Sequence, residues 1–287
     1  MNVALVGVGN MGAPMAGCIA RAGHALMVFD ASREQALKVA AVHGCRAAAG
    51  LDELADSQFI VTMLPTGQVV SDLYLRDGLA ERLRSGTIAI DMSSSEPTLT
   101  RRLGADLARR GIVLIDAPVS GGVPRAALGT LAIMIGGDDK EAIDRARPLL
   151  RAMGDRLFDT GGLGTGHAMK ALNNFVAAAG FAACAEALIA GERFGLDPTR
   201  MVEILNVSTG RNFHTDVVLR EQVIGGKFAT GFTLGLLAKD VKIAADLTRD
   251  LNFDAPLVRL VSARFDQARD ALGYGRDNSE AIKAWKD

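Results

Sequence analysis

The apolar and polar positions of this chain follow two patterns, which meet near residue 160. Before that point, short apolar runs alternate with stretches of helical spacing. Runs of nearly continuous apolar character are typical of parallel strands that helices cover on both faces. The expected strands are residues 3–6, 25–29, 59–64, 87–91, 112–116, 131–137 and 156–158, and the expected helices between them are 12–22, 32–43, 67–75, 97–110 and 139–152.

After residue 160 only helical periodicity remains. A glycine-rich run, Gly161–Gly166, leads into an apolar helix expected from Met169 to Ala190. Breakers delimit four more helices, expected at residues 198–209, 233–250, 256–272 and 278–286. We therefore predict an α/β protein. Residues 1–160 form a doubly wound, mainly parallel sheet domain, and residues 161–287 form an all-α domain that begins with a long interdomain helix.

The long apolar helix has no broad polar stripe, which predicts that it is buried. It nevertheless carries Lys170 and Asn174, which lie on one helix face because they are four residues apart. Buried polar side chains need partners or a cavity, and pockets favour domain boundaries. We therefore predict a site at this helix. Its length is close to that of a membrane span, but Lys170, Asn173, Asn174 and Glu186 are costly in lipid, so we expect no membrane partner.

A glycine turn follows the first expected strand, with the sequence Gly7-Val8-Gly9-Asn10-Met11-Gly12, and a helical stretch comes next. In this arrangement the first glycine permits a tight turn, and the second lets the backbone approach a pyrophosphate. The third lets helix and strand pack closely. Free N–H groups at the positive end of the helix would bind the phosphates. We predict that residues 1–160 are a Rossmann-type domain that binds NAD or NADP through this turn.

The second expected strand ends in Asp30, eighteen residues after Gly12, where a ribose-binding acid belongs. Its carboxylate would accept hydrogen bonds from the adenosine ribose and repel a 2′-phosphate, which favours NAD over NADP. Arg33 could pair with that phosphate instead, so NADP stays open. Asp30 could also cap the helix that begins near Ser32.

Three segments begin where expected strands end: Leu64-Pro65-Thr66, Asp91 through Ser95, and Asp116 through Gly122. Ligands of open α/β sheets bind beyond the carboxyl ends of the strands, so these segments are expected to line the cofactor and substrate. Proline, serine and glycine after strands are also ordinary turn residues, and each segment alone is a weak signal.

The composition excludes several classes of protein. A net charge of −1 in 287 residues gives no general attraction to nucleic acid, and this length suits two domains. The three cysteines are odd in number and lie in apolar contexts, which argues against disulfides and fits a reducing compartment. The histidines other than His167 have no metal-ligand spacing, and the N-terminus lacks the basic start of a signal peptide. We predict a cytoplasmic protein without a metal site.

Taken together, four segments resemble the β-hydroxyacid dehydrogenase family, which includes 3-hydroxyisobutyrate dehydrogenase. The resemblance covers essentially the whole chain, and four blocks in the right order are more specific than any one. The blocks are Gly7–Ala16, Asp116–Gly122, Gly161–Asn174 and Ala238–Asp240. A relation to 6-phosphogluconate dehydrogenase is conceivable from the shared architecture, but this chain is short for that enzyme's larger helical domain.

The resemblance implies roles for individual residues. Lys170 matches the family's catalytic lysine, and Asn174 matches an amide that helps to hold the substrate. Lys239 is similar to a family lysine near cofactor and substrate, with Asp240 beside it. Ser120, Gly121 and Gly122 match a family loop that binds the substrate carboxylate. Leu64, Pro65 and Ser94 match family residues that contact NAD.

The chemistry of these residue types agrees with a dehydrogenase. Reduction of a carbonyl group needs a hydride on carbon and a proton on oxygen, and oxidation reverses both. Lys170 could supply the proton if its pKa falls from about 10.4 through burial or a neighbouring cation such as Lys239. His167 is a rival acid, since its ordinary pKa near 6.5 suits proton transfer, but it lies in a turn that varies within the family.

We therefore predict an NAD-dependent oxidoreductase that interconverts a small β-hydroxy acid and its semialdehyde. One alternative is NADPH-dependent reduction of glyoxylate, tartronate semialdehyde or succinic semialdehyde. Another is a dinucleotide-binding module without turnover, which would need neither Lys170 nor Asn174. The substituent of the substrate is expected near residues 208–214. The apolar helical domain suggests a homodimer or homotetramer.

Overall fold

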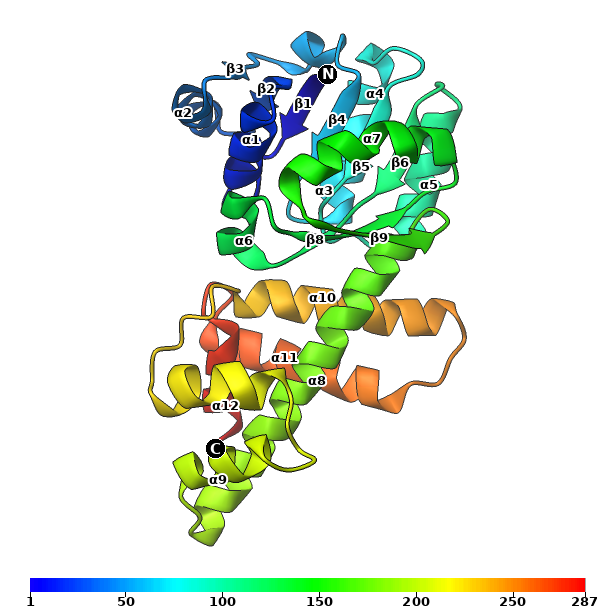
Figure 1. The fold of residues 1–287 in the computed structure, drawn as a ribbon. Coiled ribbons are helices and arrows are strands. Elements are labelled where there is room, and N and C mark those ends of the chain that lie inside the picture. The colour runs from blue at the N-terminus through cyan, green and yellow to red at the C-terminus, as the bar shows by residue number, and fades with distance from the viewer. Residues whose placement is uncertain (287) are drawn as a thin grey trace. The chain divides into compact units, whose positions relative to one another are not determined.

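A computed structural model describes residues 1–286 of the chain (Figure 1). The chain divides into two compact units, Met1–Lys170 and the part from Ala171 onward. The first unit is built from strands with helices between them, and every regular element that lies wholly in the second is a helix. This is the predicted α/β architecture with a helical C-terminal part.

The sheet of the first unit has nine strands in the order β3-β2-β1-β4-β5-β6-β8-β7, with β9 paired to β8. The six strands from β3 to β6 in this order are parallel, whereas β8 is antiparallel to both β6 and β7. The strands are β1 (Asn2–Val6), β2 (Ala25–Phe29), β3 (Arg46–Ala47), β4 (Phe59–Thr62), β5 (Ile88–Asp91), β6 (Val113–Asp116), β7 (Val119–Ser120), β8 (Ala132–Gly136) and β9 (Arg156–Gly161). The chain order reverses between β1 and β4, and this is where doubly wound sheets bind their ligands.

Helices cover both faces of this sheet. They are α1 (Gly12–Arg21), α2 (Arg33–His43), α3 (Gly67–Leu75), α4 (Leu79–Arg82), α5 (Pro97–Ala108), α6 (Gly122–Leu128) and α7 (Lys140–Met153). Val3 and Leu5 pack in a core with α1, α2 and α7, whereas Ala4 and Val6 pack in a second core with α3, α4 and α5. Successive residues of a strand point to opposite faces, so a strand covered on both sides must be apolar throughout.

The second unit has one main core. Its helices are the C-terminal part of α8 (Thr165–Phe194), then α9 (Pro198–Asn206), the π-helix η2 (His214–Ile224), α10 (Leu234–Asp250), α11 (Pro256–Leu272), the short 3₁₀ helix η3 (Asn278–Glu280) and α12 (Ala281–Trp285). Phe181 of α8, Phe265 of α11 and Trp285 of α12 meet in this core, with the Phe265 and Trp285 rings 5.3 Å apart and nearly perpendicular. Edge-to-face ring packing of this kind is favourable.

The prediction that α8 is buried on all sides is wrong. Its buried residues in the second unit follow a spacing of three and four, as at Ala178, Phe181, Ala182 and Ala185, so only one face is packed. Val176 is 67% exposed. Apolar composition could not show which face is covered. The helix is long and apolar enough to cross a membrane by length and composition alone, a test that core helices also pass.

Several short elements are absent from the sequence prediction. The strands β3 and β7 have two residues each, too few to show a period. The segment Asp116–Gly122, expected as a loop, contains β7 and the first residue of α6. The π-helix η2 is missing from the prediction because its spacing is neither that of an α-helix nor that of a strand. The predicted helix 278–286 begins as η3, where Asp277 and Glu280 form a capping box.

Candidate active site

The glycine turn joins β1 to α1, and each of its three glycines has a different environment. Gly7 has a φ of +90°, and a Cβ there would collide with the carbonyl oxygen of Met63. A Cβ on Gly12 would collide with the carbonyl oxygen of Gly7, whereas a Cβ on Gly9 would meet nothing within 4 Å. The outer two glycines are therefore needed for the turn and its packing. Gly9 leaves the backbone open, and the turn fits the pyrophosphate of a dinucleotide.

Asp30 lies beside this turn, at the end of β2. Its Oδ2 accepts a hydrogen bond from the Val8 N–H at 2.9 Å, and its Oδ1 accepts one from the Ser32 N–H at 2.9 Å. The cap of α2 is Ser32, whose hydroxyl accepts from the Gln35 N–H, so the alternative interpretation of Asp30 as the helix cap is wrong. Each carboxylate oxygen keeps a second acceptor position, which suits ribose hydroxyls.

Gln35 completes the support of the turn and was not singled out from the sequence. Its Nε2 donates to the Val8 carbonyl oxygen at 2.7 Å, while Asp30 accepts from the Val8 N–H. The Val8 N–H and carbonyl groups are therefore held by the side chains of Asp30, which follows β2, and Gln35 of α2. Arg33, the first residue of α2, is exposed.

The ends of β4 and β5 are joined by side chains around Asp91. The buried Asp91 carboxylate accepts hydrogen bonds from the Thr62 hydroxyl at 2.9 Å and the Ser95 hydroxyl at 2.7 Å. The Ser93 hydroxyl accepts from the Leu64 N–H at 2.9 Å. These bonds fix the two segments that follow the strands. Because β4 and β5 are parallel neighbours, the predicted cofactor residues Leu64, Pro65 and Ser94 lie at the same edge of the sheet.

The segment after β6 has two parts. Asp116 is fully buried and accepts hydrogen bonds from the Gly164 N–H at 2.7 Å and the His167 N–H at 2.8 Å, so it holds the start of α8 rather than a ligand. Ser120 ends β7, and Gly121 and Gly122 follow with φ values of +138° and +67°. Side chains rarely adopt these conformations, so the backbone geometry of this predicted carboxylate loop requires glycine.

Lys170 lies in the second turn of α8 and is half-buried. One turn further along the helix is Asn174, the residue that the sequence places on the same face. His167, the rival acid, is one turn earlier, but its side chain is fully buried and its Nδ1 lies 2.8 Å from the Thr100 hydroxyl. The imidazole is thus used in a contact within the protein.

Three predicted residues of the second unit form a buried polar cluster. The Asn174 Nδ2 donates to Asp240 Oδ2 at 2.6 Å, and the Lys239 ammonium lies 2.8 Å from Asp240 Oδ1. Asn174 and Asp240 are 6% and 3% exposed. The cation compensates the buried carboxylate, and the carboxylate fixes the amide. Asp240 therefore orients the Asn174 amide from its N–H side, while the Asn174 Oδ1 accepts from the Asn173 Nδ2 at 3.1 Å.

Replacing Asp240 by alanine is expected to lower the free energy of unfolding by about 1–3 kcal/mol, because the buried Asn174 N–H group loses its acceptor. Urea titration followed by circular dichroism measures this change. Asp246→Ala is the matched control, since Asp246 lies on the same helix and pairs with Lys242 and Arg249 at the surface, where ion pairs contribute little. Equal losses in both variants would contradict a special role for Asp240.

Comparison with known proteins agrees with this geometry. Residues 2–162 match a family model described as the NAD-binding domain of 6-phosphogluconate dehydrogenase. Residues 164–285 match a model described as the NAD-binding part of NADP-dependent 3-hydroxyisobutyrate dehydrogenase. The 3-hydroxyisobutyrate dehydrogenase of Pseudomonas aeruginosa is 34% identical, over 99% of this chain and 98% of that protein. The chain belongs to the β-hydroxyacid dehydrogenase family.

A further relative and a solved structure are similar to this β-hydroxyacid dehydrogenase over nearly the whole chain. The 3-sulfolactaldehyde reductase of Escherichia coli is 34% identical, over 98% of this chain and 94% of that protein. A solved structure of Mycobacterium tuberculosis 3-hydroxyisobutyrate dehydrogenase with L-serine has a TM-score of 0.92 and 32% identity, and the match covers all of both chains. The predictions of family, fold class and dehydrogenase activity with a nicotinamide dinucleotide are confirmed.

The predicted substituent segment of this dehydrogenase, residues 208–214, is organised by Asn212. Its Oδ1 accepts from the His214 N–H at 2.9 Å. The His214 Nε2 lies 2.6 Å from the Ala177 carbonyl oxygen, so Nε2 carries the hydrogen, and burial lowers the pKa of His214 below its usual value. The His214 ring is therefore used in a contact within the protein.

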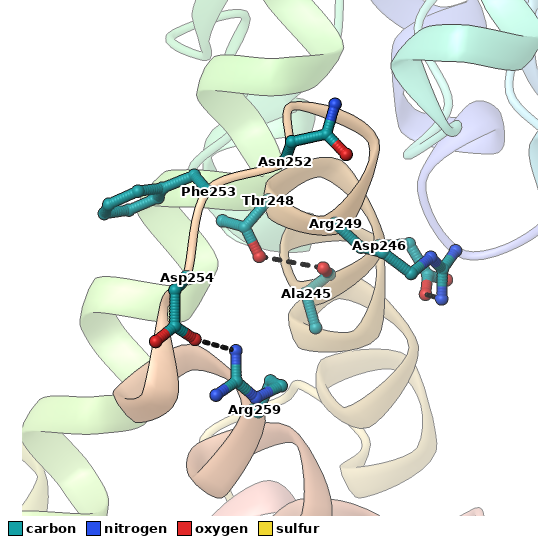
Figure 2. A pocket seen from close by; sticks show the side chains of 8 residues that line it. All are labelled: Ala245, Asp246, Thr248, Arg249, Asn252, Phe253, Asp254 and Arg259. Atoms are coloured by element: carbon teal, nitrogen blue, oxygen red, sulfur yellow. Dashed lines mark hydrogen bonds and ion pairs between the residues drawn. The ribbon is translucent and has the colours of Figure 1, made fainter.

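A hollow at the end of α10 contains none of the predicted site residues (Figure 2). Figure 2 shows that Asp254 and Arg259, 2.7 Å apart, form an ion pair at its side. Arg249 pairs with Asp246 at 2.8 Å, so both arginines already have carboxylate partners. Within residues 1–286, no three histidine, cysteine or acidic side chains are arranged as a metal site.

Proposed function

We propose that the chain is an NAD-dependent dehydrogenase that interconverts a small β-hydroxy acid and its semialdehyde, with Lys170 as the general acid and base. The observation that carries the proposal is the cluster around Asp240. It fixes the Asn174 amide one helical turn after Lys170 on the same helix. A lysine next to a fixed amide suits a substrate that must be oriented while it gains or loses a proton.

Each predicted residue has a distinct part in this reaction. A nicotinamide dinucleotide held by the glycine turn would supply the hydride acceptor for oxidation and the hydride donor for reduction. Lys170 takes the hydroxyl proton during oxidation and returns it to the carbonyl oxygen during reduction. Ser120, Gly121 and Gly122 form the loop that binds the substrate carboxylate. Asn174 and Lys239 hold the substrate, and Asp240 keeps the amide oriented.

The substrate class follows from the carboxylate loop and from the relatives. 3-Hydroxyisobutyrate and L-serine, which the relatives' names contain, each carry a carboxylate and a hydroxyl on the carbon β to it. We test the proposal by measuring NADH formation with 3-hydroxyisobutyrate, serine, glycerate, threonate, 3-hydroxypropionate and 4-hydroxybutyrate. Turnover of one of the β-hydroxy acids supports the proposal. Turnover confined to 4-hydroxybutyrate, a γ-hydroxy acid, would contradict the substrate class.

NAD is the proposed cofactor because the Asp30 carboxylate lies beside the glycine turn, and its negative charge would repel a 2′-phosphate bound there. NADPH-dependent reduction of a small aldehyde acid is the second candidate. It is favoured by the exposed Arg33 at the start of α2 and by the NADP-dependent enzyme in the second family model's description.

Replacing Asp30 by asparagine is expected to raise kcat/KM for NADP relative to NAD about tenfold, because the negative charge that repels the 2′-phosphate is removed. The asparagine oxygen can accept one of the two backbone hydrogen bonds that Asp30 accepts, and the other is lost. Steady-state rates with both cofactors give this ratio. Arg33→Ala is the opposing control and should lower the use of NADP in the Asp30→Asn protein. A wild-type enzyme that prefers NADP would contradict the assignment of Asp30.

Self-association as a homodimer or homotetramer in the cytoplasm is part of the proposal. Met169, Leu172 and Val176 of α8 are 44%, 37% and 67% exposed, and a second copy would cover such apolar side chains. Light scattering on the purified protein gives the mass in solution. A monomer at micromolar concentration would contradict this part alone.

A further inference from the structure

His167 is buried in the first turn of α8, three residues before Lys170, and the proposed chemistry does not use it. Its side chain is 0% exposed. The ring Nδ1 lies 2.8 Å from the Thr100 hydroxyl, and Nε2 lies 3.6 Å from Asp91 Oδ2. Burying an imidazole costs free energy that an apolar side chain in the same space would not cost. The presence of a histidine at this position therefore needs an explanation, and its polar contacts provide one.

The direction of the bond between His167 and Thr100 follows from the hydroxyl's other partner. The Thr100 hydroxyl donates its single hydrogen to the Glu96 carbonyl oxygen at 3.1 Å, one turn earlier on α5. Its oxygen is therefore an acceptor toward the ring, and Nδ1 of His167 carries the hydrogen. The bond joins α5 to the first turn of α8.

The backbone of the same turn is held independently. Asp116 accepts the N–H groups of Gly164 and His167, and a carboxylate at a helix N-terminus is favourable. A Cβ on Gly166 would collide with the Met134 carbonyl oxygen, so the turn is packed directly against β8. These contacts fix where α8 begins. The bond from the His167 ring to Thr100 then fixes its rotation about its own axis.

We propose that His167 is a positioning residue, which acts through Thr100 to set the direction in which α8 presents Lys170. His167 and Lys170 belong to the same helix. If α8 rotates about its axis at His167, the Lys170 side chain therefore turns by the same angle as the helix. The inference rests on the proposed function, in which the amine of Lys170 must reach the substrate oxygen. It assigns His167 a task other than that of the rival acid.

The bond is tested by matched substitutions at both ends. Thr100→Val removes the hydroxyl at nearly constant volume, and Thr100→Ser keeps it. His167→Leu removes the donor, and His167→Asn keeps an N–H group near the position of Nδ1. We expect Thr100→Val and His167→Leu to lower kcat about tenfold or more with KM for NAD within twofold of wild type. The double variant should be no worse than either, because both remove one bond.

The conservative variants Thr100→Ser and His167→Asn keep the bond, so their kcat should stay within about threefold of wild type. A second readout does not need turnover. The rate at which an amine-specific acylating reagent labels Lys170, followed by mass spectrometry, should change severalfold in Thr100→Val, while labelling of the exposed Lys242 should not change.

The two readouts separate the inference from the proposed function. A wild-type protein without turnover on the hydroxy-acid panel would remove the proposed function, and the labelling rate of Lys170 would still decide whether Thr100 and His167 set its position. An unchanged labelling rate and an unchanged kcat in Thr100→Val, with only a lower melting temperature, would overturn the inference.

Discussion

Lys170→Ala is expected to lose about a hundredfold to ten-thousandfold in kcat while its Kd for NAD stays close to that of wild type. The amine is the proposed proton carrier, and the residues that fit the dinucleotide lie at the glycine turn and the strand ends. The loss should therefore fall on the chemical step. Steady-state kinetics with the best β-hydroxy acid, together with calorimetric titration of NAD, separate the two effects.

The control for this variant is Lys242→Ala, which removes an exposed lysine that pairs with Asp246 on α10. Its kcat should stay within about twofold of wild type, as expected for a surface substitution. Near-normal turnover in Lys170→Ala would refute the assignment of the acid and base. A parallel loss of NAD binding would instead show that the substitution disturbs the fold of the cofactor unit.

Gly9→Ala and Gly12→Ala are expected to fail in different ways. A Cβ at Gly9 meets nothing within 4 Å, so the free energy of unfolding should change by no more than about 0.5 kcal/mol. NAD affinity should nevertheless fall about tenfold or more, because the added methyl group occupies the side from which the pyrophosphate approaches the backbone. Thermal unfolding and NAD titration of the same sample measure both quantities.

In Gly12→Ala the added Cβ collides with the carbonyl oxygen of Gly7 inside the turn. Relieving that collision requires a backbone shift, and we expect destabilisation of about 1–3 kcal/mol in addition to weaker NAD binding. If Gly9→Ala bound NAD as tightly as wild type, the turn between β1 and α1 could not be the pyrophosphate site. If Gly12→Ala were as stable as wild type, the close packing of helix and strand would not depend on that glycine.

The strands that the sequence predicts well are those buried on both faces. All four residues of β4 and all four of β5 are buried, and a continuous apolar run in the sequence predicts such burial directly. The two-residue strands β3 and β7 are too short to show an apolar run of this kind. The start of α8 was predicted at Met169 but lies at Thr165, because its cap is the Asp116 side chain, 48 residues before Gly164 in the chain. Local sequence does not contain that contact.

The candidate site also has parts that the sequence predicts and parts that it does not. The glycine turn, Asp30, Lys170 and Asn174 can be predicted because their spacing within one segment carries the information. The bond between Thr100 and His167 joins residues 67 positions apart, and the fold alone brings them together. Asp91 and Asp116 did leave a signal, since each is a carboxylate that ends an apolar strand. Such a carboxylate must find buried donors, whose identity only the structure gives.

The most direct test of the central claim is the pH dependence of kcat for hydroxy-acid oxidation, measured for the wild type and for Lys170→Arg. Arginine keeps the positive charge but does not release its proton near neutral pH. The wild-type rate should rise with pH, because a general base must be unprotonated to take the hydroxyl proton. The arginine variant should be about a hundredfold slower or worse and lack that rise. A variant with the wild-type rate and pH profile would contradict a proton transfer by residue 170.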